Sequence, residues 1–379
     1  MLKRIKNKKI PWRHLLSLIL ILRGLTLVVA YFAQKFLPFK FSFPYAEIVL
    51  FPYGSPLLWS FGNFDGVHYL LLSEKGYVFG LTQAFFPFYP LLIRWLALII
   101  HNRILVGLLI SHFSLVGALI LLFKLVKLDF SSTVAKKTIL SLIFFPTAFF
   151  FLSIYTESLF LFLLLGSFYL IRQKKFWLAG VVGAIASATR LVGIFLVIAF
   201  LYEWWLTSKR RISQLVASLL PTGGLLIYMN YLGIKFGDPL MFAHVQAEFG
   251  AGRSSERLIL LYQVFWRYLK MIFTVDRSNP IYFTVWLEFL SAFIFLLLLA
   301  WAWHKGERKS YLLFAILAYL LPTLTGTFSS MPRYVLVLFP AFIMLGRIKS
   351  AFWYSLWLLI SASLLIISTA LFTRGYWIS

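Results

Sequence analysis

The chain of 379 residues contains no cysteine and few acidic residues. Without thiols it has no disulfide, no thiolate nucleophile and no thiolate metal site. It carries 12 Asp and Glu against 36 Lys and Arg, which gives a formal net charge of +24. The sequence also lacks a Walker phosphate loop, a Rossmann glycine pattern and an HExxH zinc motif. Nucleotide-driven chemistry and zinc-protease chemistry are therefore not expected.

Apolar residues dominate the chain. Hydrophobic residues make up 61% of it and aromatic residues 19%, and the mean hydropathy is +0.88. A soluble domain could not bury so much apolar surface without large exposed patches. The composition predicts an all-α, multi-pass protein of the cell membrane, with residues 1–379 as one integral membrane domain. The basic residues form short clusters between apolar runs, so membrane lipids, and not nucleic acid, are the expected partners.

Eleven apolar runs are long enough, or nearly so, to cross a bilayer. With a cytoplasmic N-terminus, they place the basic clusters in the cytoplasm and the C-terminus outside. This solution requires that residues 84–101 do not cross. Pro87, Pro90 and Arg94 interrupt that segment, so we expect a juxtamembrane or re-entrant helix there. The eleven runs cover approximately residues 14–33, 104–126, 138–152, 154–171, 176–191, 193–206, 212–233, 281–303, 310–327, 332–346 and 351–373.

Two long segments, 34–103 and 234–280, then lie on the extracytoplasmic side, while the other connections are short. Catalytic residues often lie on long loops held by a rigid scaffold, so we expect the functional site in these two segments. Juxtamembrane helices are expected in the first of them.

The first outer loop contains Asp65, flanked by Gly62 and Gly66, which let the backbone turn tightly beside a ligand. On a helix that begins near Asp65, His68 shares the face of the carboxylate. Such a pair can act as a general base oriented by an imidazole, or supply half of a metal site. Two ligands are too few to indicate a metal, so none is predicted. A solvated loop carboxylate is the alternative for Asp65, and Tyr69 could either stack on a sugar or join an aromatic interface belt.

Glu157 is the second candidate acid. It lies in an outer hairpin between two apolar runs and is the only acid between Asp129 and Glu203. The topology places it on the same side of the membrane as the first outer loop. A lone acid in an apolar hairpin indicates a functional role, with a structural hydrogen bond as the alternative.

Arg190 and Arg333 lie at the outward ends of apolar runs, and neither has a neighbouring acid in the sequence. Because guanidinium groups bind phosphate through a planar fork of donors, both are candidate ligands of an anionic lipid phosphate. Snorkelling to lipid headgroups is the alternative for each. In the second outer loop, His244 and Gln246 are polar groups that could contact an acceptor.

Several short blocks of the chain, among them Asp65-Gly66 with His68-Tyr69-Leu70, Tyr155 to Phe160 and Ser330 to Tyr334, together resemble the PIG-V-type mannosyltransferases. They occur in order, extend from about residue 60 to 345, and are more specific together than any one alone. Phe64 is one departure, because the family commonly has tryptophan there, although the aromatic character is kept. The matching blocks are Asp65-Gly66 with His68-Tyr69-Leu70, Gly76-Tyr77, Phe85 to Leu91, Tyr155 to Phe160, Ala188-Thr189-Arg190, Gly237 to Leu240, Ser330 to Tyr334 and Phe339-Pro340.

The resemblance implies a GT-C-type integral membrane glycosyltransferase that uses a polyprenyl-phosphate-linked sugar on the extracytoplasmic face. The loop aspartate of the family corresponds to Asp65, which is the expected catalytic base for inverting transfer of a hexose to a lipid or glycan acceptor. No cofactor is expected. Our own inference adds Glu157 as a group that orients the acceptor or His68. Arg190, Arg333 and the adjacent Tyr334 are added as substrate-binding residues.

A transporter or flippase of lipid-linked sugars is the main alternative function. It would place its acids and broken helices near the middle of the membrane. Here the acids gather on one side beside a long loop, which favours an enzyme. A noncatalytic assembly subunit is a further alternative, but it gives Asp65 and Glu157 no task.

Overall fold

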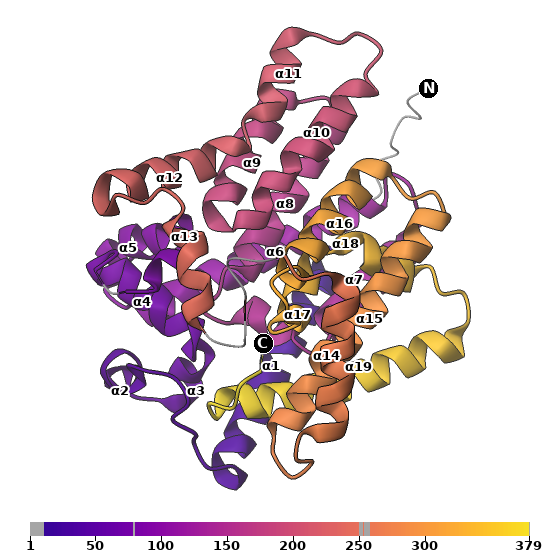
Figure 1. Ribbon diagram of the computed structural model, residues 1–379. Helices are drawn as coiled ribbons and strands as arrows, with labels where there is room; N and C mark the ends of the chain where they lie inside the picture. Colours follow the sequence, from indigo (N-terminus) through magenta and orange to yellow (C-terminus); the bar gives the residue numbers. More distant parts are fainter. Residues whose placement is uncertain (1–10, 79, 250–252, 254–257, 379) are drawn as a thin grey trace.

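The computed structural model describes residues 11–78, 80–249, 253 and 258–378, and within these residues the chain is helical without strands (Figure 1). This confirms the predicted all-α class. In chain order the α-helices are α1 (Trp12–Phe36), α2 (Ala46–Val49), α3 (Pro56–Trp59), α4 (Asp65–Lys75), α5 (Phe88–Ile100), α6 (Arg103–Val126), α7 (Ser132–Ile143), α8 (Glu157–Arg172), α9 (Phe176–Thr189), α10 (Leu196–Trp205), α11 (Ile212–Leu219), α12 (Thr222–Phe236), α13 (Met241–His244), α14 (Leu261–Thr274), α15 (Ile281–His304), α16 (Lys309–Thr323), α17 (Met331–Tyr334), α18 (Phe339–Gly346) and α19 (Ala351–Thr373).

Four helices of the described chain, α1, α6, α15 and α19, are long and apolar enough to cross a membrane. Each coincides with a predicted apolar run to within a few residues, because no proline interrupts it. Helices α11 and α12 meet at an angle of 47° and can count together as a fifth span. Pro221 lies at their junction, where it cannot donate the backbone hydrogen bond that a continuous helix needs. Several long, apolar helices in one chain are typical of a membrane-embedded protein.

The other predicted runs form shorter helices, so the count of eleven spans stays a prediction. In the run 332–346, α17 begins with Pro332 in its first turn, a 3₁₀ turn follows, and α18 then begins with Pro340 in its first turn. In the run 138–152, α7 ends at Ile143 and the chain continues into a 3₁₀ turn. Hydropathy reports that these segments are apolar but does not report where a helix breaks.

The first outer loop is folded around α4 and α5. Helix α5 has 13 residues and therefore spans about 20 Å, less than the roughly 30 Å of a hydrocarbon core. This length fits the juxtamembrane helix expected over residues 84–101. The Arg94 Nε donates to the Ser73 carbonyl oxygen at 2.8 Å, which ties α5 to α4. The Tyr89 hydroxyl donates to the Gly107 carbonyl oxygen at 3.1 Å, which ties α5 to α6.

The centre of the molecule is built on α6, α8 and α9, which pack in that order (Figure 1). The segment before α8 also joins the first outer loop. The Ile154 amide donates to the Phe61 carbonyl oxygen at 2.9 Å, and the Tyr155 hydroxyl donates to the Asn63 carbonyl oxygen at 2.8 Å. A Cβ atom on Gly66 would lie only 3.3 Å from the Ile154 carbonyl oxygen. Glycine at that position lets the N-termini of α4 and α8 approach closely.

Candidate active site

Four charged side chains from separate parts of the chain meet where α4, α8, α9 and α17 come together. The Arg333 Nη1 donates to the Asp65 Oδ2. The Arg333 Nε lies 3.5 Å from the Glu157 Oε1, and the Arg190 Nη1 donates to that same oxygen at 2.6 Å. We call these four residues the charge cluster. All four were candidates from the sequence, and the structure joins them in one continuous series of ion pairs.

The ends of helices explain the signs of these charges. Asp65 is the first residue of α4, and Glu157 is the first residue of α8. The macrodipole of a helix stabilises a carboxylate at its N-terminus. Arg190 follows the last residue of α9, where the same dipole favours a cation. The expectation that a helix begins at Asp65 is confirmed.

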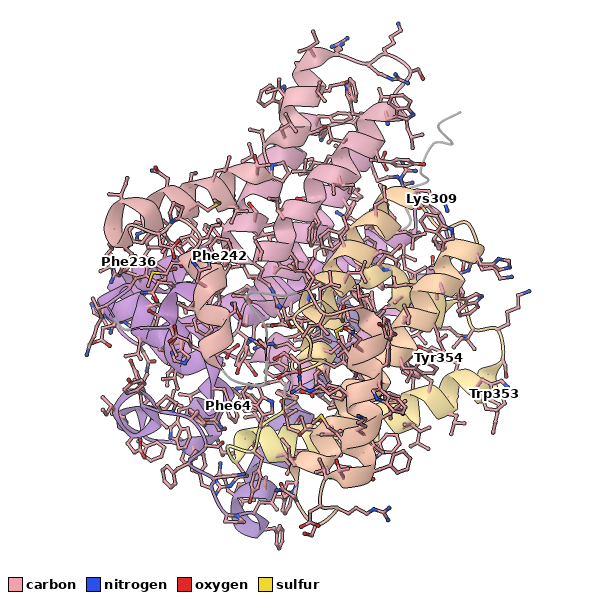
Figure 2. All side chains as sticks on the ribbon, viewed as in Figure 1. Phe64, Phe236, Phe242, Lys309, Trp353 and Tyr354 are labelled. Atoms are coloured by element: carbon pink, nitrogen blue, oxygen red, sulfur yellow. The ribbon has the colours of Figure 1, made fainter. Side chains whose placement is uncertain are left out.

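Two residues with left-handed backbone conformations lie directly in the site. Phe64 has φ +57° and Ser330 has φ +69°, a region that residues with a side chain rarely adopt. Figure 2 labels Phe64. Its ring centroid lies 5.8 Å from that of Phe372 and 5.2 Å from that of Trp377. Packing against the C-terminal end of α19 therefore holds the backbone conformation that presents Asp65.

A buried carboxylate supports Ser330, and the sequence analysis missed it. Glu288 on α15 accepts from the Ser330 amide at 3.3 Å and from the Tyr268 hydroxyl at 2.6 Å. The Tyr268 hydroxyl also lies 3.1 Å from the Thr327 Oγ1. Because Ser330 begins the short turn that carries Arg333, these bonds position the guanidinium. A single acid inside a predicted span was the sequence signal that could have identified Glu288.

Aromatic rings surround the two arginines. The Arg333 Cζ lies 5.6 Å from the centroid of the Phe150 ring and 5.4 Å from that of Tyr155. Tyr334 contacts both cations, with its ring centroid 5.6 Å from the Arg333 Cζ and 5.5 Å from the Arg190 Cζ. Such cation–π contacts stabilise guanidinium groups in partly dehydrated surroundings. Tyr334 therefore belongs to the site by position, and its role toward a substrate stays a prediction.

Exposure and charge distinguish the two acids. The Glu157 side chain is 1% exposed, whereas that of Asp65 is 19% exposed, so Asp65 is the carboxylate that a substrate can reach. Burial raises the pKa of Asp65, but the charge and hydrogen bond of Arg333 outweigh that effect. The nearby Arg253 charge lowers it further. The resulting pKa lies below the ordinary value for aspartate, and Asp65 is ionised.

His68 and Tyr69 follow Asp65 on α4. The His68 ring stacks on Phe85 with 4.9 Å between centroids. Burial lowers the pKa of His68 despite the opposing charge of Asp65, so the imidazole is neutral at neutral pH. The Tyr69 ring lies against the rings of Phe85 and Tyr89. This packing places Tyr69 in a buried aromatic cluster and not in an interface belt, and its binding of substrate stays a prediction.

In the second outer loop, the contact of His244 and Gln246 with an acceptor stays a prediction. The His244 Nδ1 pairs with the Asp238 Oδ2 at 2.7 Å, and the His244 side chain is 61% exposed. The structure does not bring His244 into contact with the charge cluster. The Gln246 Oε1 accepts from the Arg253 Nη1 at 3.1 Å, and Arg253 in turn influences Asp65. Arg253 is a third arginine near the site, and its place among the mixed charges of this loop was the available sequence signal.

The described residues include no preformed metal-binding site. Among the residues that the structure describes, no three His, Cys, Asp or Glu side chains are grouped so that they could hold an ion. Asp65 and His68 supply at most two ligands, and Asp65 is paired with Arg333. Metal independence stays a prediction.

Comparison with known proteins supplies the family. The family model described as mannosyltransferase (PIG-V) matches residues 9–229, more than half of the chain. The chain belongs to the PIG-V mannosyltransferase family. This PIG-V family member is thus a membrane-embedded glycosyltransferase, whose substrates are in general terms a lipid-linked sugar donor and a glycan or lipid acceptor. The match includes Asp65, Glu157 and Arg190, whereas Arg333 lies beyond it. No curated protein and no solved structure matches the chain closely enough to show a relationship.

Proposed function

We propose that this PIG-V family mannosyltransferase transfers mannose from a polyprenyl-phosphate donor to a hydroxyl group of a lipid or glycan acceptor. The reaction takes place at the extracytoplasmic surface and inverts the anomeric centre. The observation that carries the proposal is the series of ion pairs from Asp65 through Arg333 to Glu157. It sets an accessible carboxylate directly beside a guanidinium that is suited to phosphate.

The reaction is a single displacement. The acceptor oxygen attacks the anomeric carbon of the sugar, and a new C–O bond forms on the face opposite the phosphate. The bond from that carbon to the phosphate oxygen breaks, and its electron pair stays on the leaving polyprenyl phosphate. Asp65 accepts the acceptor proton as general base. Arg333, with Arg190 beside it, offsets the negative charge that develops on the leaving phosphate.

The ion pair between Asp65 and Arg333 also determines the sequence in which the two substrates are engaged. While Arg333 holds Asp65, the low pKa makes this carboxylate a weak base. The donor phosphate offers Arg333 a second anion and draws the guanidinium toward itself. Losing part of its counterion raises the pKa of Asp65 and strengthens it as a base. Glu157 keeps Arg190 as its partner throughout, so no buried carboxylate is left without a counterion. Donor binding therefore precedes deprotonation of the acceptor.

The extracytoplasmic position is argued from α8, which connects the charge cluster to a basic end. Glu157 begins this helix, and Arg172 ends it 15 residues further along the chain, a rise of about 22 Å. Arg172 starts a short basic cluster that extends to Lys175. Because basic clusters beside apolar segments favour the cytoplasmic side, we expect Glu157, at the other end of α8, to lie toward the extracytoplasmic side.

The test is Asp65→Asn in purified protein supplied with polyprenyl-phosphate mannose. Mass spectrometry follows the released polyprenyl phosphate and the mannosylated acceptor. Removing the general base is expected to lower kcat by about 10²- to 10⁴-fold. The folded structure should persist, since Arg333 still has Glu157 as a partner.

Glu74→Gln is the matched control, because Glu74 is an exposed acid on the same helix. It should transfer mannose at the wild-type rate. Wild-type turnover by Asp65→Asn would eliminate Asp65 as the base. Transfer by the wild type from a nucleotide sugar alone, with none from the polyprenyl donor, would overturn the proposed donor.

A further inference from the structure

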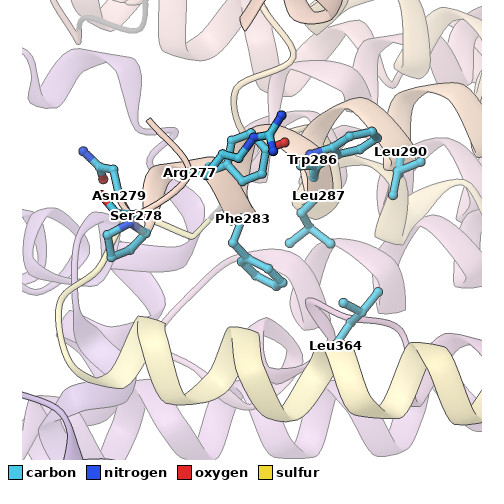
Figure 3. A pocket seen from close by; sticks show the side chains of 10 residues that line it. Arg277, Ser278, Asn279, Phe283, Trp286, Leu287, Leu290 and Leu364 are labelled. Carbon is cyan, nitrogen blue, oxygen red and sulfur yellow. The ribbon is translucent and has the colours of Figure 1, made fainter. Parts of the chain in front are cut away.

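A groove separate from the charge cluster lies between α15 and α19. Its volume is about 420 Å³, within the range of about 300–1,000 Å³ that is typical of small-molecule sites. Its apolar wall comes from α15, and Leu364 of α19 closes the other side (Figure 3). Its mouth is polar and comes from the connection between α14 and α15. The mouth residues are Arg277, Ser278 and Asn279, and the wall residues on α15 are Phe283, Trp286, Leu287 and Leu290.

The depth of the groove matches one leaflet of a bilayer. Leu290 lies nine residues beyond Ile281, the first residue of α15, which corresponds to about 14 Å along the helix. Leu364 lies nine residues before Thr373, the last residue of α19, at about the same depth. Half of a hydrocarbon core is about 15 Å. The groove thus extends from the membrane surface to about the middle of the bilayer.

The groove opens toward lipid and not toward the reaction centre. On α15 the exposed fraction of Leu290 is 38% and that of Leu297 is 52%, while on α19 that of Ile360 is 51%. In a helix long and apolar enough to span a membrane, such side chains face acyl chains. Glu288 lies on another face of α15, where it contacts Ser330. An occupant of the groove would therefore be a lipid of the surrounding bilayer and not a reacting sugar.

The mouth of the groove favours an anionic headgroup. Arg277 is exposed, and in the part of the chain that the structure describes it has no ion-pair partner. The neighbouring Asp276 is occupied locally, because it accepts from the Ser278 amide at 2.9 Å and from the Ser278 hydroxyl at 2.7 Å. The net charge of +24 adds a general attraction for anionic lipids.

We propose that this groove binds one anionic phospholipid, with its phosphate against Arg277 and one acyl chain along the wall of α15 down to Leu364. The mouth lies at the same end of the molecule as the charge cluster. The Thr284 hydroxyl donates to the Trp377 carbonyl oxygen at 2.8 Å, and the Trp377 ring contacts Phe64. The bound lipid therefore belongs to the leaflet next to the charge cluster, where it fills the crevice between α15 and α19.

Native mass spectrometry of the purified full-length protein tests the proposal. The protein in detergent is titrated with phosphatidylglycerol and with phosphatidylcholine of identical acyl chains. One arginine near a membrane surface favours an anionic lipid by about fivefold in affinity. Wild type should therefore retain one phosphatidylglycerol with about that preference, and Arg277→Gln should bring the preference close to one. Leu364→Trp, which fills the floor of the groove, should abolish the retained lipid of either kind.

Two control variants match these substitutions. Arg210→Gln removes an exposed arginine elsewhere, and Ile366→Trp adds the same bulk on the opposite face of α19 from Leu364. Both should bind lipid as the wild type does. An unchanged preference in Arg277→Gln, or lipid retained by Leu364→Trp, would overturn the proposal and indicate nonspecific annular lipid. Displacement of the lipid by equimolar polyprenyl phosphate would overturn the proposed occupant and assign the groove to a substrate.

Discussion

Arg333 makes ion pairs with two carboxylates at once, and this geometry depends on the guanidinium fork. Its Nη1 contacts Asp65 while its Nε approaches Glu157. A lysine ammonium is a compact point charge and could not span both acids with fixed geometry. The same fork suits a phosphate group, so one side chain can hold the resting site together and then bind the donor. Exchange of partners at Arg333 is thus the chemical basis of the proposed mechanism.

This exchange predicts a difference between two pH profiles. In the free protein the pKa of Asp65 lies below its ordinary value of about 3.9, so kcat/KM for the donor should not fall with Asp65 protonation between pH 8 and about pH 4.5. When saturating donor has drawn Arg333 away, the pKa of Asp65 is higher, and kcat should fall with acid at a higher pH. Steady-state kinetics of mannose transfer across this range measure both profiles.

A control is needed because His68 also lies beside Asp65 and has a lowered pKa. His68→Gln should keep the separation between the two profiles. If kcat and kcat/KM lost activity at the same pH in both proteins, the exchange at Arg333 would be refuted. The ion pair also affects stability. Since the folded pKa of Asp65 is depressed, its contribution is present above about pH 3.9 and is lost as the pH falls through the folded value.

The sequence predicted a site residue where that type of residue is rare in the chain. Asp65 and Glu157 stood out because acids are scarce in the chain, and both lie in the charge cluster. The acidic partners of Arg190 and Arg333 were not predictable, because sequence distance says nothing about neighbours 33 and 268 residues away. The left-handed backbone at Phe64 was also unpredictable, since tertiary packing imposes it.

Among the helices, α15 supports the charge cluster through the hydrogen bonds of Glu288. Its carboxylate fixes the amide of Ser330 and the hydroxyl of Tyr268. Glu288→Leu removes both acceptors from a buried position and should lower kcat/KM for the donor by about tenfold or more, since one such bond contributes about 1–3 kcal/mol. Glu288→Gln keeps a carbonyl oxygen that can accept from Ser330, so it should restore much of that loss.

The measurement is transfer kinetics with thermal unfolding of each variant in parallel. Loss confined to donor KM in the leucine variant, with recovery in the glutamine variant, identifies a positioning role. Equal losses in both variants, or unchanged kinetics in the leucine variant, would show that Glu288 does not position Arg333. Leu287→Met on the same helix is a control that leaves both hydrogen bonds intact.

Proline determined which elements could be predicted. The long helices α1, α6, α15 and α19 followed directly from uninterrupted apolar runs. The run 332–346 did not become one helix, because Pro340 in the first turn of α18 cannot donate the backbone hydrogen bond that would continue a helix from the preceding turn. The break is functionally relevant, since it creates the short turn on which Arg333 lies. Hydropathy alone favoured a continuous span there, and the residue-level effect of proline prevailed.

At the scale of the whole molecule, ion pairs gather at two ends. Among the described residues, one group comprises the charge cluster. Another group joins Arg172 to Asp129, Arg308 to Glu203, and Arg347 to Glu307. Helix α8 connects the two groups, since Glu157 begins it and Arg172 ends it. The basic clusters near the second group predict that it lies in the cytoplasm and the charge cluster outside.

The absence of cysteine makes this topology directly testable. Single cysteines are introduced at Thr274, beside the groove mouth, and at Ser208, in the connection before α11; both positions are exposed. A membrane-impermeant maleimide should label Thr274→Cys in intact cells, and Ser208→Cys only after permeabilisation. The reverse pattern would place the charge cluster in the cytoplasm and contradict the proposed face of reaction.

A double-mutant cycle tests most directly whether Asp65 and Arg333 act as one unit in mannose transfer. Transfer from polyprenyl-phosphate mannose is measured as kcat/KM for the wild type, Asp65→Asn, Arg333→Gln and the double variant. Groups that act as a unit lose their effect together. The double variant should therefore be no slower than the slower single variant, within about threefold. Losses that multiply in the double variant would show that the two residues act independently and would contradict the proposed mechanism.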